Sequence, residues 1–170
     1  MPNYKVIDGA LRLQAREGAS GTAAHGRRVA LVAARFNADI VDAMVVGAQA
    51  AWLRQGGDPD SLLQVRVPGA FELPLAARKL AASGRFDAVI ALGCVIRGDT
   101  AHFDFVAGEA ARGIADAARD TGVPVIFGVL TTENVEQAVE RASPARMDKG
   151  GEAMEAALEM ALVLTAIDSP

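Results

Sequence analysis

The sequence holds very few of the side chains from which metal sites and disulfides are made. Cysteine occurs once, as Cys94, so an intrachain disulfide and a cysteine-cluster zinc site are both excluded. Histidine occurs twice, as His25 and His102, which is too few for a histidine-rich metal site, and the spacing HExxH is absent. We therefore predict a protein that binds no metal.

Long apolar runs and an excess of basic charge are missing as well. No run approaches the roughly 18 apolar residues that a membrane span needs, and residues 1–26 lack the hydrophobic stretch of a secretory signal. The formal net charge of −4 argues against a nucleic-acid partner, which would require a basic face. We therefore expect a cytoplasmic protein with no membrane segment and no nucleic-acid partner.

Aromatic residues are scarce at 5%, whereas hydrophobic residues make up 51% and charged residues 22% of the 170 positions. This balance provides a sizeable core and favours closely packed helices and strands over an aromatic-rich β-sandwich. The length suits one domain. Residues 1–26 have weak periodicity and are predicted to form an N-terminal arm with a short strand over 4–13, and residues 27–170 are predicted to form a single α/β domain.

From residue 27 onward, apolar runs that suit buried strands alternate with segments in which apolar residues recur every three or four positions. The predicted strands are 29–33, 62–67, 88–94 and 123–129, and the predicted helices are 39–55, 72–83, 102–121, 135–141 and 151–166. Such alternation specifies parallel βαβ units. We therefore predict a three-layer α/β sandwich with a four-stranded parallel core sheet and a ligand site beyond the carboxyl ends of its strands.

The segment after the first predicted strand, Ala34-Arg35-Phe36-Asn37, carries an aromatic residue. It contains neither the P-loop pattern nor GxGxxG. It also lacks the Ser/Thr-rich phosphate loop of a flavodoxin, which disfavours an FMN carrier. Phe36 either stacks on a flat ligand ring or only covers the end of the core.

The segments after the next two strands carry ionisable side chains at helix starts. Glu72 either complements the helix dipole or accepts hydrogen bonds from substrate hydroxyls. Around Gly98 a turn opens the longest helix, whose N–H groups suit an anion, although Asp99 or Thr100 can equally be an ordinary N-cap. His102 is either structural or a proton-transfer residue, because imidazole exchanges protons near neutral pH.

The fourth strand and the helix after it add Phe127 and Arg141. Arg141 lies near a predicted helix C-terminus, where it either satisfies the local dipole or forks onto a phosphate, which suits guanidinium geometry. Position along the chain does not separate these two interpretations.

Taken together, these segments resemble the motifs of the lumazine synthase family. Residues 34–37 are similar to its Gly/Ser-Arg-Phe-Asn motif, and residues 67–72 match its Val-Pro-Gly-Ala-Phe-Glu signature. Residues 93–102 resemble Gly-x-Val-Ile-Arg-Gly-x-Thr-x-His, and residues 125–134 and 136–142 complete the series. Five motifs in the family's order and spacing, over residues 29–167, make the resemblance specific.

The resemblance implies a flavodoxin-like sandwich assembled into homopentamers, with active sites between neighbouring subunits and an N-terminal arm that adds a strand to the next subunit. The implied reaction is that of a transferase in riboflavin biosynthesis. It condenses 5-amino-6-(D-ribitylamino)uracil with 3,4-dihydroxy-2-butanone 4-phosphate to 6,7-dimethyl-8-ribityllumazine, without a cofactor. An icosahedral shell of pentamers and riboflavin synthase as a partner also follow from the resemblance.

The family's site residues carry over to this sequence position by position. Phe36 stacks on the pyrimidine, Glu72 reaches the ribityl hydroxyls, and His102 transfers protons. The phosphate is bound by the N–H groups of Asp99 and Thr100 and by Arg141 of the adjacent subunit. The remaining pyrimidine contacts fall on Ala70, Phe71, Phe127 and the backbone of Cys94, Val95 and Ile96.

Two departures from the family pattern concern the phosphate. The family loop Gly-Thr-Lys-Ala-Gly-Asn-Lys-Gly is replaced at 143–150, so one lysine becomes Ala145, with Arg146 displaced by one position. Asp99 stands where small uncharged residues are common, so its carboxylate must turn away from the phosphate. The alternative function is therefore a non-catalytic paralogue that binds lumazine or flavin, or forms only a shell.

Overall fold

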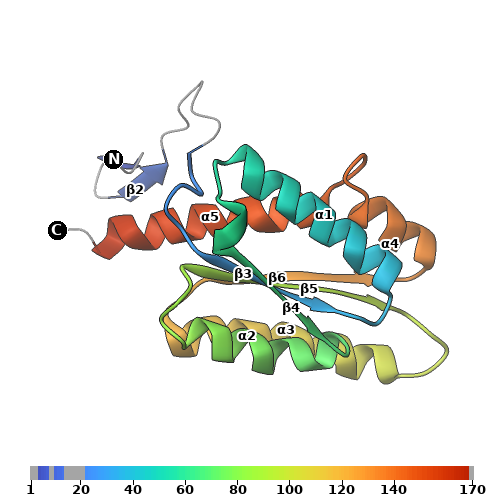
Figure 1. Ribbon diagram of the computed structural model, residues 1–170. Coiled ribbons are helices and arrows are strands. Elements are labelled where there is room, and N and C mark those ends of the chain that lie inside the picture. The colour runs from blue at the N-terminus through green and yellow to red at the C-terminus, as the bar shows by residue number, and fades with distance from the viewer. Residues whose placement is uncertain (1–3, 8–9, 14–21, 169–170) are drawn as a thin grey trace.

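The computed structural model describes residues 4–7, 10–13 and 22–168. Within them, four parallel strands in the order β4-β3-β5-β6 form a sheet in the middle of the molecule (Figure 1). The strands are β3 (Val29–Ala34), β4 (Leu62–Val67), β5 (Ala88–Ile96) and β6 (Val125–Thr132). The prediction of a four-stranded parallel core sheet is confirmed.

Helices cover both faces of this sheet (Figure 1). One face carries α1 (Ala38–Arg54), α4 (Val135–Ala142) and α5 (Lys149–Asp168), and the other carries α2 (Leu73–Ala81) and α3 (His102–Thr121). Short 3-10 turns, Pro59–Ser61 and Ala70–Glu72, precede β4 and α2. Each face of the sheet has its own buried apolar cluster. The three-layer flavodoxin-like sandwich is therefore confirmed.

The central strand β3 shows how the apolar pattern produces this architecture. All of its residues are buried, because it lies inside the sheet with helices on both sides. Leu31 belongs to the cluster under α1 and α5, whereas Val32 belongs to the cluster under α2 and α3. This is the two-residue period of a strand. Burying a leucine or valine side chain contributes roughly 1.5–3 kcal/mol, so the run that predicts the strand also holds it in place.

Strands β5 and β6 reach further than the apolar runs predict. The predicted ends are residues 94 and 129, but the strands end at Ile96 and Thr132, because residues 94–96 pair with residues 130–132. β6 also starts later than predicted, since Pro124 has no N–H for the ladder. By contrast, the pairing of β3 with β5 stops at Leu92. Within the part of the chain that the structure describes, the end of β5 therefore has a neighbouring strand on one side only.

The helix predicted over 72–83 is shorter than expected. Ala70–Glu72 form a 3-10 turn, and α2 runs from Leu73 to Ala81. Pro74 in the first turn suits a helix start, because an N–H is not needed there. Glu72 therefore lies just before α2 rather than inside it.

The N-terminal segment departs from the single strand predicted over residues 4–13. Tyr4–Ile7 (β1) and Ala10–Leu13 (β2) form two strands that pair with each other antiparallel. Closer to the domain, Ala24 is buried, and its N–H donates to the carbonyl of Gln55 at 3.0 Å. The rest of the predicted arm lies outside the described residues.

None of the helices that the structure describes combines the length and the apolar character that a membrane crossing requires.

Helices α1 and α5 approach so closely that glycine is required at their contact. A Cβ atom on Gly150 would overlap the main-chain carbonyl of Met44, and one on Gly47 would overlap the carboxylate of Asp148. Asp148 has a left-handed φ of +44°, and its Oδ1 accepts a hydrogen bond from the N–H of Gly151 at 3.0 Å. These contacts fix the start of α5 against α1.

We predict that Gly150→Ala lowers the free energy of unfolding by about 1–3 kcal/mol, because the added methyl group forces two helix backbones apart. The matched control is Gly108→Ala in α3, where a Cβ would meet no atom within 4 Å. That change should be neutral or stabilise by up to about 1 kcal/mol, since alanine is the better helix former. Urea unfolding at one fixed protein concentration measures both. Equal stability of Gly150→Ala and the wild type would contradict the close approach.

Candidate active site

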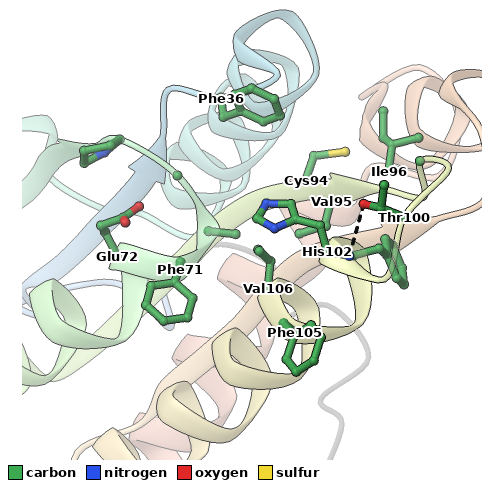
Figure 2. A pocket seen from close by; sticks show the side chains of 15 residues that line it. Phe36, Phe71, Glu72, Cys94, Val95, Ile96, Thr100, His102, Phe105 and Val106 are labelled. Carbon is green, nitrogen blue, oxygen red and sulfur yellow. Dashed lines mark hydrogen bonds between the residues drawn. The ribbon is translucent and has the colours of Figure 1, made fainter.

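A cavity of about 720 Å³ lies beyond the carboxyl ends of the strands (Figure 2). Its lining comes from Phe36 after β3, from residues 68–72 after β4, and from the stretch 94–106 that joins the end of β5 to the first turns of α3. Three of the four segments singled out in the sequence therefore meet at one place. The fourth, which follows β6, contributes no lining residue among those described.

Phe36 is held at the cavity by its neighbour Asn37. Asn37 precedes α1 with a left-handed φ of 58°, a conformation that asparagine tolerates better than most residues. Its Nδ2 donates to the carbonyl of Cys94 at 2.9 Å, and the N–H of Phe36 donates to the carbonyl of Pro68 at 3.0 Å. An aromatic ring that covered the core would be mostly buried, but Phe36 is 72% exposed. Its ring is thus available to a flat ligand.

The turn after β4 supplies three of the predicted residues. Ala70 is buried, Phe71 is 57% exposed, and Glu72 is exposed, and all three line the cavity. Figure 2 shows Phe71 and Glu72 on a different side of the cavity from His102. Within the described part of the chain, the Glu72 carboxylate caps no helix N–H. It therefore remains available to accept hydrogen bonds from a ligand.

The end of β5 forms the floor of the cavity. Cys94, Val95 and Ile96 all line it, and they pair with β6 while β3 has already ended. Backbone groups on the open side can therefore bond to a ligand, apart from the Cys94 carbonyl that Asn37 occupies. The Cys94 side chain is buried, and this burial raises the pKa of its thiol from 9.0 to about 11.

The loop from Gly98 to Ala101 leads into α3. Ala101 occupies the N-cap position and makes no side-chain capping hydrogen bond, so Asp99 is not the cap of this helix. The hydroxyl of Thr100 accepts a long hydrogen bond of 3.4 Å from the N–H of His102. Gly98 and Thr100 line the cavity, whereas the exposed Asp99 does not. The N–H of Asp104 donates to the carbonyl of Ala101 at 3.1 Å, so only part of this helix start remains open to an anion.

His102 is exposed at the start of α3 and lines the cavity. In Figure 2 its imidazole lies between the strand end at Cys94 and the helix residue Val106. It is the one histidine among the described lining residues, and with Glu72 and Cys94 it makes up their ionisable side chains. Proton transfer inside this cavity therefore has one well-placed candidate.

Two predicted residues, Phe127 and Arg141, do not reach the cavity of this chain. Phe127 lies on the edge strand β6, where it is 45% exposed in a separate groove that Lys149 and Glu152 also line. Arg141 lies in α4, and its Nη1 donates to the carbonyl of Gln137 at 3.1 Å. Neither side chain acts at this cavity unless a second copy of the chain brings it there.

Other lining residues were not identified from the sequence. Phe103, Phe105 and Val106, in the first turns of α3, all border the cavity. The helical period assigns Phe103 and Val106 to the buried face, which hides their second role. Phe105 is 71% exposed, and an aromatic residue on the polar side of a helix, three positions after His102, is the signal that marks it.

No group of three or more His, Cys, Asp or Glu side chains in the described residues has the arrangement of a metal site. The described lining residues also include no lysine or arginine. The cavity thus presents exposed aromatic rings, an open strand edge, a carboxylate, an imidazole and a helix start. It suits a flat polar ring better than a strongly anionic ligand alone.

We predict that Cys94 reacts slowly with thiol reagents in the folded protein. Raising the pKa from 9.0 to about 11 lowers the thiolate fraction at pH 8 by roughly a hundredfold. A thiolate of higher pKa is also more nucleophilic, which raises its reaction rate by about tenfold and offsets part of this loss. The native thiol should therefore react at least about tenfold more slowly than the same thiol in denaturant, since burial also limits access. Titration with a chromogenic disulfide measures both rates. Equal rates would contradict the burial of the Cys94 thiol.

Comparison with known proteins gives this geometry a family. The family model described as 6,7-dimethyl-8-ribityllumazine synthase matches residues 26–165. The 6,7-dimethyl-8-ribityllumazine synthase of Deinococcus radiodurans is 52% identical over 145 residues, which cover 85% of this chain and 94% of that relative. Its counterpart of the same name in Nitratidesulfovibrio vulgaris is 53% identical over 141 residues, which cover 83% of this chain and 90% of that relative. The chain therefore belongs to the 6,7-dimethyl-8-ribityllumazine synthase family.

Proposed function

We propose that this chain catalyses the formation of 6,7-dimethyl-8-ribityllumazine from 5-amino-6-(D-ribitylamino)uracil and 3,4-dihydroxy-2-butanone 4-phosphate. The observation that carries the proposal is the cavity at the strand ends, which brings Phe36, Glu72 and His102 together from three separate segments. Each of these residues belongs to a motif of the family. The other products are inorganic phosphate and water, so the reaction needs no electron acceptor.

The pyrimidine substrate fits the aromatic side of the cavity. Its flat ring stacks on Phe36, whose face is exposed. The open backbone at Ile96 suits the donors and acceptors on the ring edge, since the N–H and carbonyl of Val95 turn toward β6. Glu72 lies on another part of the lining, where its carboxylate accepts hydrogen bonds from the ribityl hydroxyls, with Ala70 and Phe71 beside it.

The phosphate of the second substrate requires charge that one chain does not bring to its own cavity. The N–H groups near Thr100 and the start of α3 offer hydrogen bonds. The described lining includes no cationic side chain that neutralises a dianion. A neighbouring copy would supply Arg141, whose planar fork suits a phosphate, and Phe127, which would close the pyrimidine side.

His102 serves the steps in which protons move. The substrate amine adds to the ketone and loses water to form an imine, phosphate then leaves, and ring closure expels a second water. The first and last steps move protons at nitrogen and oxygen, whereas phosphate leaves as a proton is lost from the neighbouring carbon to give an enol, whose keto form the second amine attacks. His102 is the imidazole within the described lining that can carry these protons. Holding both reactants in one cavity removes much of the entropic barrier.

A shared site requires a homo-oligomer, and a closed ring of five with heterologous contacts is the assembly we propose. Exposed apolar side chains such as Phe105, Leu75 and Val135 supply surface for such contacts. Among the described strands, β4 pairs with β3 only, so its other edge can take the N-terminal arm of a neighbour as an added strand. Packing of rings into an icosahedral shell, an association with riboflavin synthase and a cytoplasmic location belong to the same proposal.

The direct test is to mix the purified protein with the two substrates in the presence of EDTA. Lumazine absorbance should appear, and phosphate should be released in equal amount, because the proposed chemistry uses no metal. Activity that is lost in EDTA and restored by a metal would contradict the cofactor-free mechanism. Binding of lumazine without turnover would identify a non-catalytic paralogue instead.

We predict that His102→Ala lowers kcat by up to about a hundredfold, the lower end of the range for general acid–base catalysis. The loss stays at this end because imine formation and ring closure have appreciable intrinsic rates. KM for the pyrimidine should change little, since the stacking contacts remain. His25→Ala is the matched control, because the only other histidine lies outside the cavity lining. Steady-state kinetics with both variants decide, and a wild-type kcat in His102→Ala would assign that residue to structure.

A further inference from the structure

Arg97 is the first residue after β5, and its side chain connects both ends of the loop 98–101. Its backbone N–H donates to the carbonyl of Thr132 at 2.9 Å, which continues the pairing with β6. Its Nε donates to the two carboxylate oxygens of Glu133 at 3.2 and 3.0 Å, and its Nη1 donates to Asp104 Oδ1 at 3.2 Å. Glu133 directly follows β6, and Asp104 lies in the first turn of α3. One side chain thus links the edge of the sheet to the helix start.

The same guanidinium packs against the cavity wall. Its central carbon lies 4.2 Å from the centroid of the Phe103 ring, within the range of a cation–π contact. Phe103 lines the cavity, whereas Arg97 does not. The guanidinium therefore packs against the Phe103 ring without itself bordering the cavity. The planar fork of arginine makes these contacts at once, which the point-like ammonium of a lysine does not.

Arg97 also balances negative charge next to the loop. Hydrogen bonds to Glu133, the larger effect, and to Asp104 raise the pKa of Arg97. The positive charge of Arg97 is therefore paired with these two carboxylates. Asp99 places a further carboxylate on the loop itself. Without Arg97, acidic side chains on three neighbouring segments would repel an anion that approaches Thr100.

These ion pairs are not a main source of folding stability. All three side chains of the network are partly exposed, and exposed ion pairs contribute little to stability. The pair between Arg112 and Glu109 in α3 is exposed as well, but it does not involve the loop. Arg97 differs from Arg112 because its partners lie on either side of the loop 98–101.

We propose that Arg97 is a positioning residue for the sugar-phosphate half of the site. It fixes the loop 98–101 and the first turn of α3, so that the N–H groups near Thr100 and the imidazole of His102 face the cavity in one arrangement. It also keeps the adjacent carboxylates from repelling the phosphate. Arg97 is not itself the phosphate ligand, since it does not line the cavity. This inference rests on the proposed function, because it assigns Arg97 to one of the two substrates.

The kinetic test compares Arg97→Met and Arg97→Lys with the control Arg112→Met. In Arg97→Met, KM for the sugar phosphate should rise about tenfold, the scale for losing one charge-assisted hydrogen bond from the loop N–H groups to the phosphate when the loop is no longer held in place. KM for the pyrimidine should change less than about twofold, since its contacts lie elsewhere. KM for the sugar phosphate in Arg97→Lys should lie between the values of the wild type and Arg97→Met, because lysine restores the charge but not the planar fork. Equal changes in both KM values, or full rescue by lysine, would overturn the positioning role.

A second readout, which needs no activity, is hydrogen exchange of the substrate-free protein. Arg97→Met should speed exchange at residues 98–104 while leaving the core of β5 unchanged, and Arg112→Met should leave residues 98–104 as in the wild type. Unchanged exchange at 98–104 in Arg97→Met would overturn the inference whatever the kinetics. If the wild-type protein forms no lumazine but Arg97→Met still exchanges faster at residues 98–104, the proposed function alone would be overturned.

Discussion

In the parallel sheet, β5 continues past the point at which its neighbour β3 stops pairing with it, and the rest of the site depends on this stagger. β6 stays beside β5 to the end, so only the side toward β3 is left open. Asn37 uses part of this opening by donating to the Cys94 carbonyl, which draws the loop after β3 toward β5. Phe36 is thereby held beside an open strand edge. A ligand with a flat polar ring needs this combination, because it can stack on Phe36 and form hydrogen bonds with the strand.

The sequence predicts the parts of this arrangement that depend on local pattern. The run of buried residues in β3 and the helical period of α3 give both elements nearly their observed bounds, because burial on regular faces repeats along the chain. The predicted ends of β5 and β6 are wrong, because the observed ends depend on pairing between residues 36 positions apart. Phe36, Glu72 and His102 follow strands or start helices, so their positions were predictable. The bond from Asn37 to Cys94 was not.

The cavity of one chain combines binding groups for a flat ring with a shortage of positive charge. The nearby Arg97 is already bound by Glu133 and Asp104, so it adds no free cation to the cavity. Arg141 lies on α4, on the opposite face of the sheet from α3. A dianionic substrate bound at the start of α3 would therefore need a cation from another molecule. This charge balance, more than any apolar surface, is the reason for expecting the chain to act as an assembly.

The central claim is that each site takes its proton-transfer residue from one chain and its phosphate ligand from another. The most direct test unfolds His102→Ala and Arg141→Ala together, refolds the mixture, and measures lumazine formation at a sugar-phosphate concentration well below KM. Random assembly places a chain with an intact His102 next to one with an intact Arg141 at about one site in four. The mixture should therefore recover up to about a quarter of the wild-type rate, above the average of the two variants refolded separately. A rate equal to that average would contradict the shared site.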